Sequence, residues 1–179
     1  MDQETKVAQA VEEANRQNDL VELSTGVILR AHKANPTTLV KVMANFPRPK
    51  PPVQFMKIMG REMENPDDPD YIDRVKAWKT ESSTAILNAL ILLGTSLESK
   101  PKGMPGPDDQ DWLNEYSVLG LQTNFENKSW RYLTWVSFKA CADENDLRMI
   151  QEVVGRLSGV REVDVKAAST FPGRNNASG

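Results

Sequence analysis

Hydrophobic positions recur every three or four residues along one stretch of the chain, from Asn65 to Gly94. That spacing places them on one face of an α-helix. Pro66 and Pro69 stand near its start, where a missing N–H is tolerated and a fixed φ is favourable. A glycine follows the last apolar residue, as is expected of a C′ position. The pattern predicts one long helix over about 68–94 with the following buried face: Tyr71, Val75, Trp78, Ser82, Ala85 or Ile86, Ala89 and Leu93.

The segment 20–32 has a different period, because apolar and polar side chains alternate on both sides of Ser24-Thr25-Gly26. Alternation around a short turn that contains glycine is typical of a β-hairpin. A two-stranded hairpin is only marginally stable alone. We therefore expect this hairpin to pack on a helix or to pair with another chain.

Between this hairpin and the long helix, an amphipathic helix is expected over 35–46, followed by four prolines within 47–52. The prolines predict an extended connector over 47–53, without internal hydrogen bonds. A stiff spacer is the simpler interpretation, and a ligand for an aromatic groove is the alternative. After the long helix, prolines and glycines predict a loop over 95–107.

The segment 108–171 is expected to contain only helices and their connections. Residues 128–140 are rich in aromatic and β-branched side chains and fit both a strand and a helix. We favour a helix because a lone strand has no evident neighbour there. Asp143 is expected to cap the next helix, which ends at Ser158-Gly159, and a short helix is expected from Val160 to Ala168.

Together these elements predict a mainly α fold, a helical domain built around one long central helix, with a small N-terminal β-hairpin. The predicted domain covers residues 20–171. Residues 1–19 are expected to form a flexible polar tail with a thin amphipathic pattern over 7–14, and residues 172–179 a disordered tail.

Composition narrows the functional class. The 179 residues are 39% hydrophobic and 26% charged, which is typical of a globular protein. One cysteine, Cys141, excludes an internal disulfide and suits a reducing compartment such as the cytoplasm. The N-terminal segment lacks an apolar core and the longest apolar run is short, so neither a signal peptide nor a membrane segment is predicted. A net charge of −3 argues against general nucleic-acid binding.

The sequence offers little for catalysis or metal binding. His32 is the only imidazole and Cys141 the only thiol, so a nucleophile–base pair or a zinc site lacks its components. The acidic clusters at 67–70 and 108–111 lack the spacing of a calcium loop and precede predicted helices, where acids are favoured. We expect a non-enzymatic protein without catalytic, cofactor-binding or metal-ligating residues.

Charge is segregated along the chain. From Val27 to Arg61 there are basic residues and no acid, whereas from Glu62 to Asp73 there are acids and no base. The two blocks either face each other or stay solvated, or else the basic block binds an acidic partner or phosphate. Candidate partner-binding residues lie in the hairpin, the basic proline segment and the aromatic segment: Val27, Leu29, Arg30, Lys33, Lys41, Arg48, Lys50, Trp130 and Trp135.

Several stretches together resemble the tail assembly chaperones of long-tailed bacteriophages: VELSTGVILRAH, PKPPV, NPDDPDY before a long helix that ends in ILLGTSL, and RYLTWVSFKA followed by LSGV. The resemblance covers about residues 20–165. It implies a non-enzymatic helical protein of the host cytoplasm that binds the tape-measure protein and assists tail-tube assembly. It also implies that the protein is absent from the finished virion.

Other functions stay open at this point. The alternative is a structural subunit of the virion, such as a minor tail or head–tail connector protein, for which the open hairpin edge would be a contact site. A nucleic-acid-binding accessory protein ranks third, on the basic block from Arg30 to Arg61. Self-association into a homo-oligomer is compatible with each of these functions.

Overall fold

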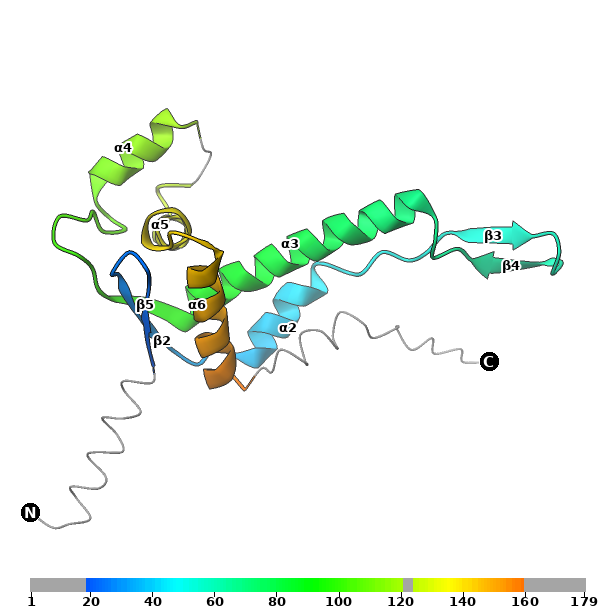
Figure 1. Cartoon of the computed structure of the whole chain (residues 1–179), viewed down its shortest axis with the longest axis horizontal. Helices are drawn as coiled ribbons and strands as arrows, with labels where there is room; N and C mark the ends of the chain where they lie inside the picture. The colour runs from blue at the N-terminus through cyan, green and yellow to red at the C-terminus, as the bar shows by residue number, and fades with distance from the viewer. Residues whose placement is uncertain (1–18, 121–123, 160–179) are drawn as a thin grey trace, which may run out of the picture. The chain divides into compact units, whose positions relative to one another are not determined.

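The structure, a computed structural model, describes residues 19–120 and 124–159. Contacts divide these residues into two compact units, of which the second spans Thr37–Ile86 and the first contains the rest. The elements, drawn in Figure 1, are β1 (Leu20–Glu22), β2 (Ile28–Ala31), α2 (Pro36–Ala44), β3 (Val53–Met56), β4 (Arg61–Glu64), α3 (Pro69–Gly94), β5 (Thr95–Ser99), α4 (Gln110–Val118), α5 (Lys128–Trp135), the π-helix η1 (Val136–Ala140) and α6 (Glu144–Leu157).

The predicted fold class is wrong. The described part of the chain is 51% helical and 14% strand, with five α-helices and two small sheets of three and two strands. A long helix is present as predicted, since α3 has 26 residues. However, a strand follows it directly and a second hairpin precedes it, so one central helix with a lone hairpin does not describe this fold. Residues 1–18 of the predicted tail at 1–19, the predicted tail at 172–179 and the predicted helix at 160–168 lie outside the described residues.

The N-terminal hairpin forms as predicted and gains a third strand. β1 pairs with β2 through Leu20↔Arg30 and Val21↔Leu29, and β5 adds antiparallel to the other edge of β2. The backbone N–H of His32 donates to the carbonyl of Gly94 at 2.7 Å, where α3 ends and β5 begins. The predicted loop at 95–107 is therefore wrong over β5. The third strand supplies the support that a two-stranded hairpin lacks.

A buried carboxylate fixes the β1–β2 turn to the first turn of α6. Asp146 is fully buried and accepts hydrogen bonds from the N–H and hydroxyl of Ser24, at 2.8 and 2.7 Å, and from the N–H of Ala142 at 2.8 Å. Burial alone would raise the pKa of Asp146, but these hydrogen bonds outweigh it and hold the pKa below its ordinary value. Asp143 caps the same helix, as predicted, by accepting from the N–H groups of Asn145 and Asp146.

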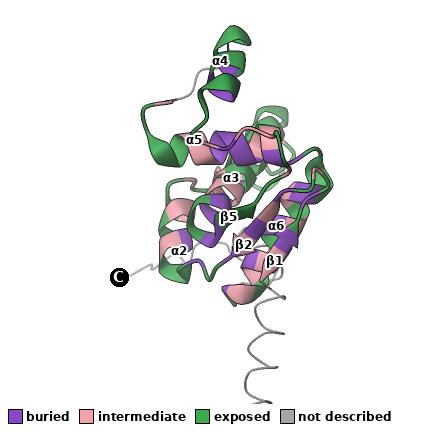
Figure 2. Cartoon of the chain, turned by 90° about the vertical axis from the view of Figure 1, so that its left-hand side faces the viewer, coloured by how far each residue is buried: buried purple, intermediate pink, exposed green. Residues whose placement is uncertain are grey.

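A close approach of two helices explains why Gly94 is a glycine. The residue ends α3 without a positive φ, so the expected C′ conformation is wrong. Instead, a Cβ at this position would overlap a methyl group of Val154 in α6. Val154 and Ile150 are fully buried, and α6 packs on β1 and β2. Figure 2 shows the buried residues of α6 as purple bands between exposed green ones.

The aromatic segment is helical, as predicted. α5 begins at the cap residue Asn127, whose side chain accepts from the N–H groups of Ser129 and Trp130, and it continues into η1. Trp135 is fully buried and donates from Nε1 to the carbonyl of Pro105 at 2.9 Å. α4 covers Gln110–Val118, within the segment 108–171 that is expected to be helical. Its Trp112 and Tyr116 form an edge-to-face cluster with Phe125.

The second unit contains α2, the proline connector, β3, β4 and the first part of α3. Asp68 caps α3 by accepting from the N–H of Tyr71 at 2.9 Å. The predicted buried face is largely correct, since Tyr71, Trp78, Ser82, Ile86 and Ala89 are buried. The prediction fails at the end of the helix, because Leu93 is 43% exposed and Leu90 and Ile91 are buried in its place.

We predict that Gly94→Ala lowers the free energy of unfolding by about 1–3 kcal/mol, because the added methyl group overpacks the contact with Val154. The loss should appear although alanine has the higher helix propensity by about 1 kcal/mol. Urea denaturation measures the free energy of unfolding of Gly94→Ala, of Val154→Ala and of the variant that carries both changes. The double variant with Val154→Ala should lose less than the sum of the single losses, and strict additivity would contradict the proposed contact.

We predict that Asp146→Asn lowers the free energy of unfolding at neutral pH by about 1–3 kcal/mol, because an amide cannot accept from all three donors. The folded-state pKa of Asp146 lies below the unfolded value of about 3.9. The contribution of the Asp146 carboxylate to the free energy of unfolding is therefore complete above the unfolded-state pKa. It is lost as the pH falls through the folded-state pKa. Denaturation curves should show the gap to wild type closing below about pH 4. The matched control is Glu144→Gln, which alters an exposed carboxylate in the same helical turn.

Candidate partner-binding surfaces

Two of the candidate residues in the hairpin belong to the core. Val27 precedes β2 and Leu29 lies within it, and both have no exposed surface. Leu29 pairs with Val21 on one side and with Leu97 on the other. These two side chains hold the three-stranded sheet on its core, so a partner cannot reach them in this fold.

Arg30 lies on the open face of the same sheet and has a partner within the chain. Its Nε and Nη2 atoms each donate to a carboxylate oxygen of Glu98 in β5, both at 2.8 Å. This bidentate contact raises the pKa of Arg30 and lowers the pKa of Glu98. Next to it, the His32 ring and the Ser96 hydroxyl are 2.7 Å apart, and Lys33 is exposed. The polar face of the sheet is thus organised by cross-strand pairs.

The candidates Lys41, Arg48 and Lys50 are exposed in the second unit. The guanidinium carbon of Arg48 lies 5.9 Å from the centre of the Trp78 ring, a cation–π geometry. Trp78 in turn donates from Nε1 to the carbonyl of Phe46 at 2.7 Å. The proline connector therefore packs against α3 of its own chain, and between them lies an open depression lined by Asn45, Phe46, Pro47, Pro49, Arg74, Ala77, Trp78 and Glu81.

The two candidate tryptophans of the aromatic segment differ in environment. Trp135 is buried, whereas Trp130 is 49% exposed one helical turn into α5. Phe138 in η1 is 61% exposed, and its ring centre lies 5.2 Å from that of Tyr116 in α4. Beyond Tyr116, Val118 at the end of α4 and the C-cap residue Leu119 are also exposed. We call the following four residues the aromatic surface: Val118, Leu119, Trp130 and Phe138.

The sequence analysis missed the most exposed apolar element, the hairpin formed by β3 and β4. Its tip residue Ile58 is 96% exposed and Met59 57%, and Phe55 within β3 is 58% exposed. A four-residue turn closes the hairpin, with Gly60 at φ 61° and its N–H donating to the carbonyl of Met56. Neither strand buries a face, and apolar residues lie on both faces, so the apolar–polar alternation that indicates a strand is weak here.

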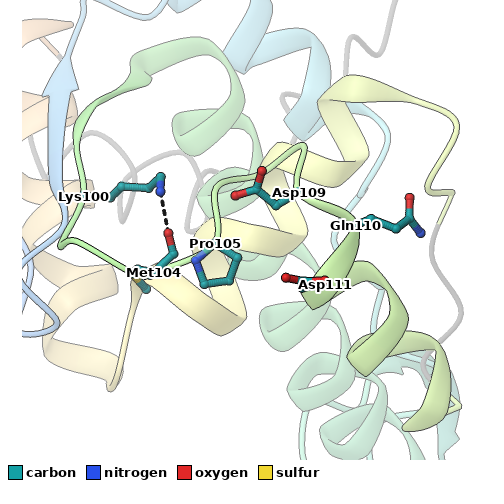
Figure 3. Close-up of a pocket in the computed structure, with 7 residues that line it drawn as sticks. Lys100, Met104, Pro105, Asp109, Gln110 and Asp111 are labelled. Atoms are coloured by element: carbon teal, nitrogen blue, oxygen red, sulfur yellow. Dashed lines mark hydrogen bonds between the residues drawn. The ribbon is translucent and has the colours of Figure 1, made fainter.

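The described residues also form a shallow pocket before α4, shown in Figure 3. Lys100 donates to the carbonyl of Met104 across it, and the carboxylate of Asp109 accepts from the N–H of Gly106. Asp108 pairs with Arg131 at 2.8 Å. These polar groups fix the loop that leads into α4, so their role is explained without a bound ligand.

The thiol of Cys141 and the imidazole of His32 are not paired in the structure. Burial raises the pKa of the Cys141 thiol to about 12, with a further contribution from Asp146, so the nucleophilic thiolate is scarce at neutral pH. His32 contacts Ser96 rather than this thiol. Among residues 19–120 and 124–159 no three His, Cys, Asp or Glu side chains are grouped to hold a metal ion. None of the helices described is both long and apolar enough to cross a bilayer.

Comparison with known proteins identifies no relative, since no protein-family model, no curated protein and no solved structure matches the chain.

We predict that Cys141 reacts with a thiol-specific reagent such as dithionitrobenzoate only as fast as the protein opens, because the thiol is buried and protonated. Absorbance recorded in native buffer and in denaturant measures the two rates, and the denatured chain is the control for full reactivity. Rapid complete labelling of the native protein would show that the thiol is accessible after all.

Proposed function

We propose that the protein is a non-catalytic tail assembly chaperone of a long-tailed bacteriophage that binds the tape-measure protein and assists tail-tube assembly in the host cytoplasm. The observation that supports this proposal is the aromatic surface, a set of four exposed apolar side chains on α4, its C-cap residue, α5 and η1. The sequence resemblance supplies the identity of the partner. A tape-measure protein is a long helical chain, and the apolar stripe of an amphipathic helix is the kind of surface that exposed aromatic side chains bind.

The contacts around the aromatic surface favour a binding role. Phe138 is held by its ring contact with Tyr116, and the neighbouring Lys139 forms an ion pair with Glu115 of α4. The N-terminus of α5 is fixed by Asn127, one residue before Lys128 and three before Trp130. An aromatic side chain on an ordered helix loses little conformational entropy when it is buried by a partner, which is why such residues dominate binding energies.

A structural subunit of the virion is the second candidate. The exposed hairpin of β3 and β4 favours it, because an ordered apolar hairpin is suited to a permanent interface. The two functions differ in whether the protein stays in the particle. A stoichiometric signal of this chain in mass spectra of purified virions would favour the structural role, and its absence would favour the chaperone.

We predict that co-expression with the tape-measure protein of the same genome yields a soluble complex, and that the double variant Trp130→Ser/Phe138→Ser weakens it at least tenfold. The reason is that both exposed side chains are proposed anchors, and the loss of one such hot-spot residue costs about 2 kcal/mol or more, roughly a thirtyfold change in Kd. Affinity capture followed by quantitative mass spectrometry measures the complex. The matched control is Ile72→Ser, another exposed apolar residue on a helix, in α3.

Two outcomes would reject the proposal. One is that wild type forms no complex and leaves the solubility of the tape-measure protein unchanged. The other is that the double variant, shown by circular dichroism to be folded, binds as tightly as wild type.

A further inference from the structure

The hairpin of β3 and β4 has two faces of opposite charge. In an antiparallel pair, residues directly opposite each other point to the same face. The register pairs Val53 with Glu64 and Phe55 with Glu62 on one face, and Gln54 with Met63 and Met56 with Arg61 on the other. We call these the acidic face (Val53, Phe55, Glu62, Glu64) and the basic face (Gln54, Met56, Arg61, Met63).

Both faces are accessible. Every residue of the two strands is exposed except Met63, which is half-buried, and Val53 and Phe55 expose 61% and 58% of their surface. Within the described residues the sheet has two strands, so both outer edges are also unpaired. A two-stranded hairpin needs a covering layer for stability, and exposed apolar groups of this size favour association.

Charge complementarity points to another copy of the same chain as the covering layer. Each face combines an apolar side chain with a charged one in the pair next to the turn, Phe55 with Glu62 and Met56 with Arg61. If the acidic face of one hairpin lies on the basic face of the next, Glu62 and Arg61 can form a bidentate ion pair, and Met56 can contact the Phe55 ring. Two identical faces in contact would instead bring like charges together, which is unfavourable.

From this arrangement we infer that the β3–β4 hairpin is a self-association surface, on which the acidic face of one copy binds the basic face of the next. The contact is head-to-tail, because different surfaces of the two copies meet. A head-to-tail contact leaves one acidic and one basic face free at the ends, so it builds rings or open chains instead of a closed two-fold dimer. This contact would form whether or not the protein also binds a tape-measure protein.

Charge reversal on one face at a time tests the inference with the full chain. In Arg61→Glu both faces are acidic, and in Glu62→Lys/Glu64→Lys both are basic. Wild type should gain mass with concentration in sedimentation velocity, whereas each variant alone should associate at least about tenfold more weakly because like charges meet. An equimolar mixture of the two variants should associate again, because every acidic face then finds a basic one. The control is Lys79→Glu, with the same change in charge as Arg61→Glu at an exposed position of α3.

The possible results separate this inference from its alternatives. If each variant fails to associate on its own but the equimolar mixture associates, misfolding is excluded as the cause, because both hairpins must be folded to bind each other. A wild type that stays monomeric at every concentration overturns the inference, as does a mixture that stays as dissociated as its components. Binding of the monomeric wild type to phosphatidylserine vesicles, lost in Ile58→Asp, would assign the hairpin to a lipid surface and would equally overturn it.

Discussion

The buried carboxylate of Asp146 is the interaction on which the first unit depends. Its oxygens accept from Ser24 and Ala142, so one side chain joins the β1–β2 turn to the start of α6 across 122 residues of sequence. A charge without partners in this position would be strongly destabilising, and three donors make it tolerable. The turn adds a second link, because the Thr25 hydroxyl donates to the carbonyl of Ala140 at the end of η1. Once the turn is fixed, β1 and β2 present Val21 and Leu29 to the core against which α6 packs.

The junction of α3 and β5 completes the sheet, and it requires a residue without a side chain at position 94. Gly94 allows the end of α3 to approach Val154, and the chain then passes directly into β5 along the edge of β2. The Thr95 hydroxyl donates to the carbonyl of Ile91 at 2.7 Å and lies 2.9 Å from the Tyr132 hydroxyl of α5. Sheet, α5 and α6 therefore meet within two residues of the end of α3. A single methyl group at Gly94 acts on all of them, because a close-packed interior leaves no space to absorb it.

Local patterns in the sequence predicted the local structure, and contacts between distant segments decided the rest. Periodicity gave the bounds of α3, and alternation around Gly26 gave the first hairpin. Cap residues such as Asp143 gave the start of α6. Periodicity shows which apolar residues share a face but not whether the rest of the chain or a partner covers that face. Val27, Leu29 and Trp135 were therefore predicted to bind a partner, although they fill the core. β5 is short and largely polar, and only its pairing with β2 makes it a strand. The hairpin of β3 and β4 carries apolar side chains on both faces, Val53 and Phe55 on one and Met56 and Met63 on the other, so no clear alternation marks it in the sequence.

The two exposed apolar surfaces differ in a way that separates their roles. Trp130 and Phe138 belong to helices that are fixed by the core through Leu133, Trp135 and Val136, so these elements stay ordered without a partner. β3 and β4 bury almost nothing, and their order in the free protein rests on one ladder of hydrogen bonds and the turn at Gly60. Fixing its backbone costs about 1–2 kcal/mol per residue, so the self-association proposed above would offset a cost that this hairpin's own fold offsets poorly. The boundary between the basic and acidic blocks of the sequence falls between Arg61 and Glu62, which point to opposite faces of this hairpin.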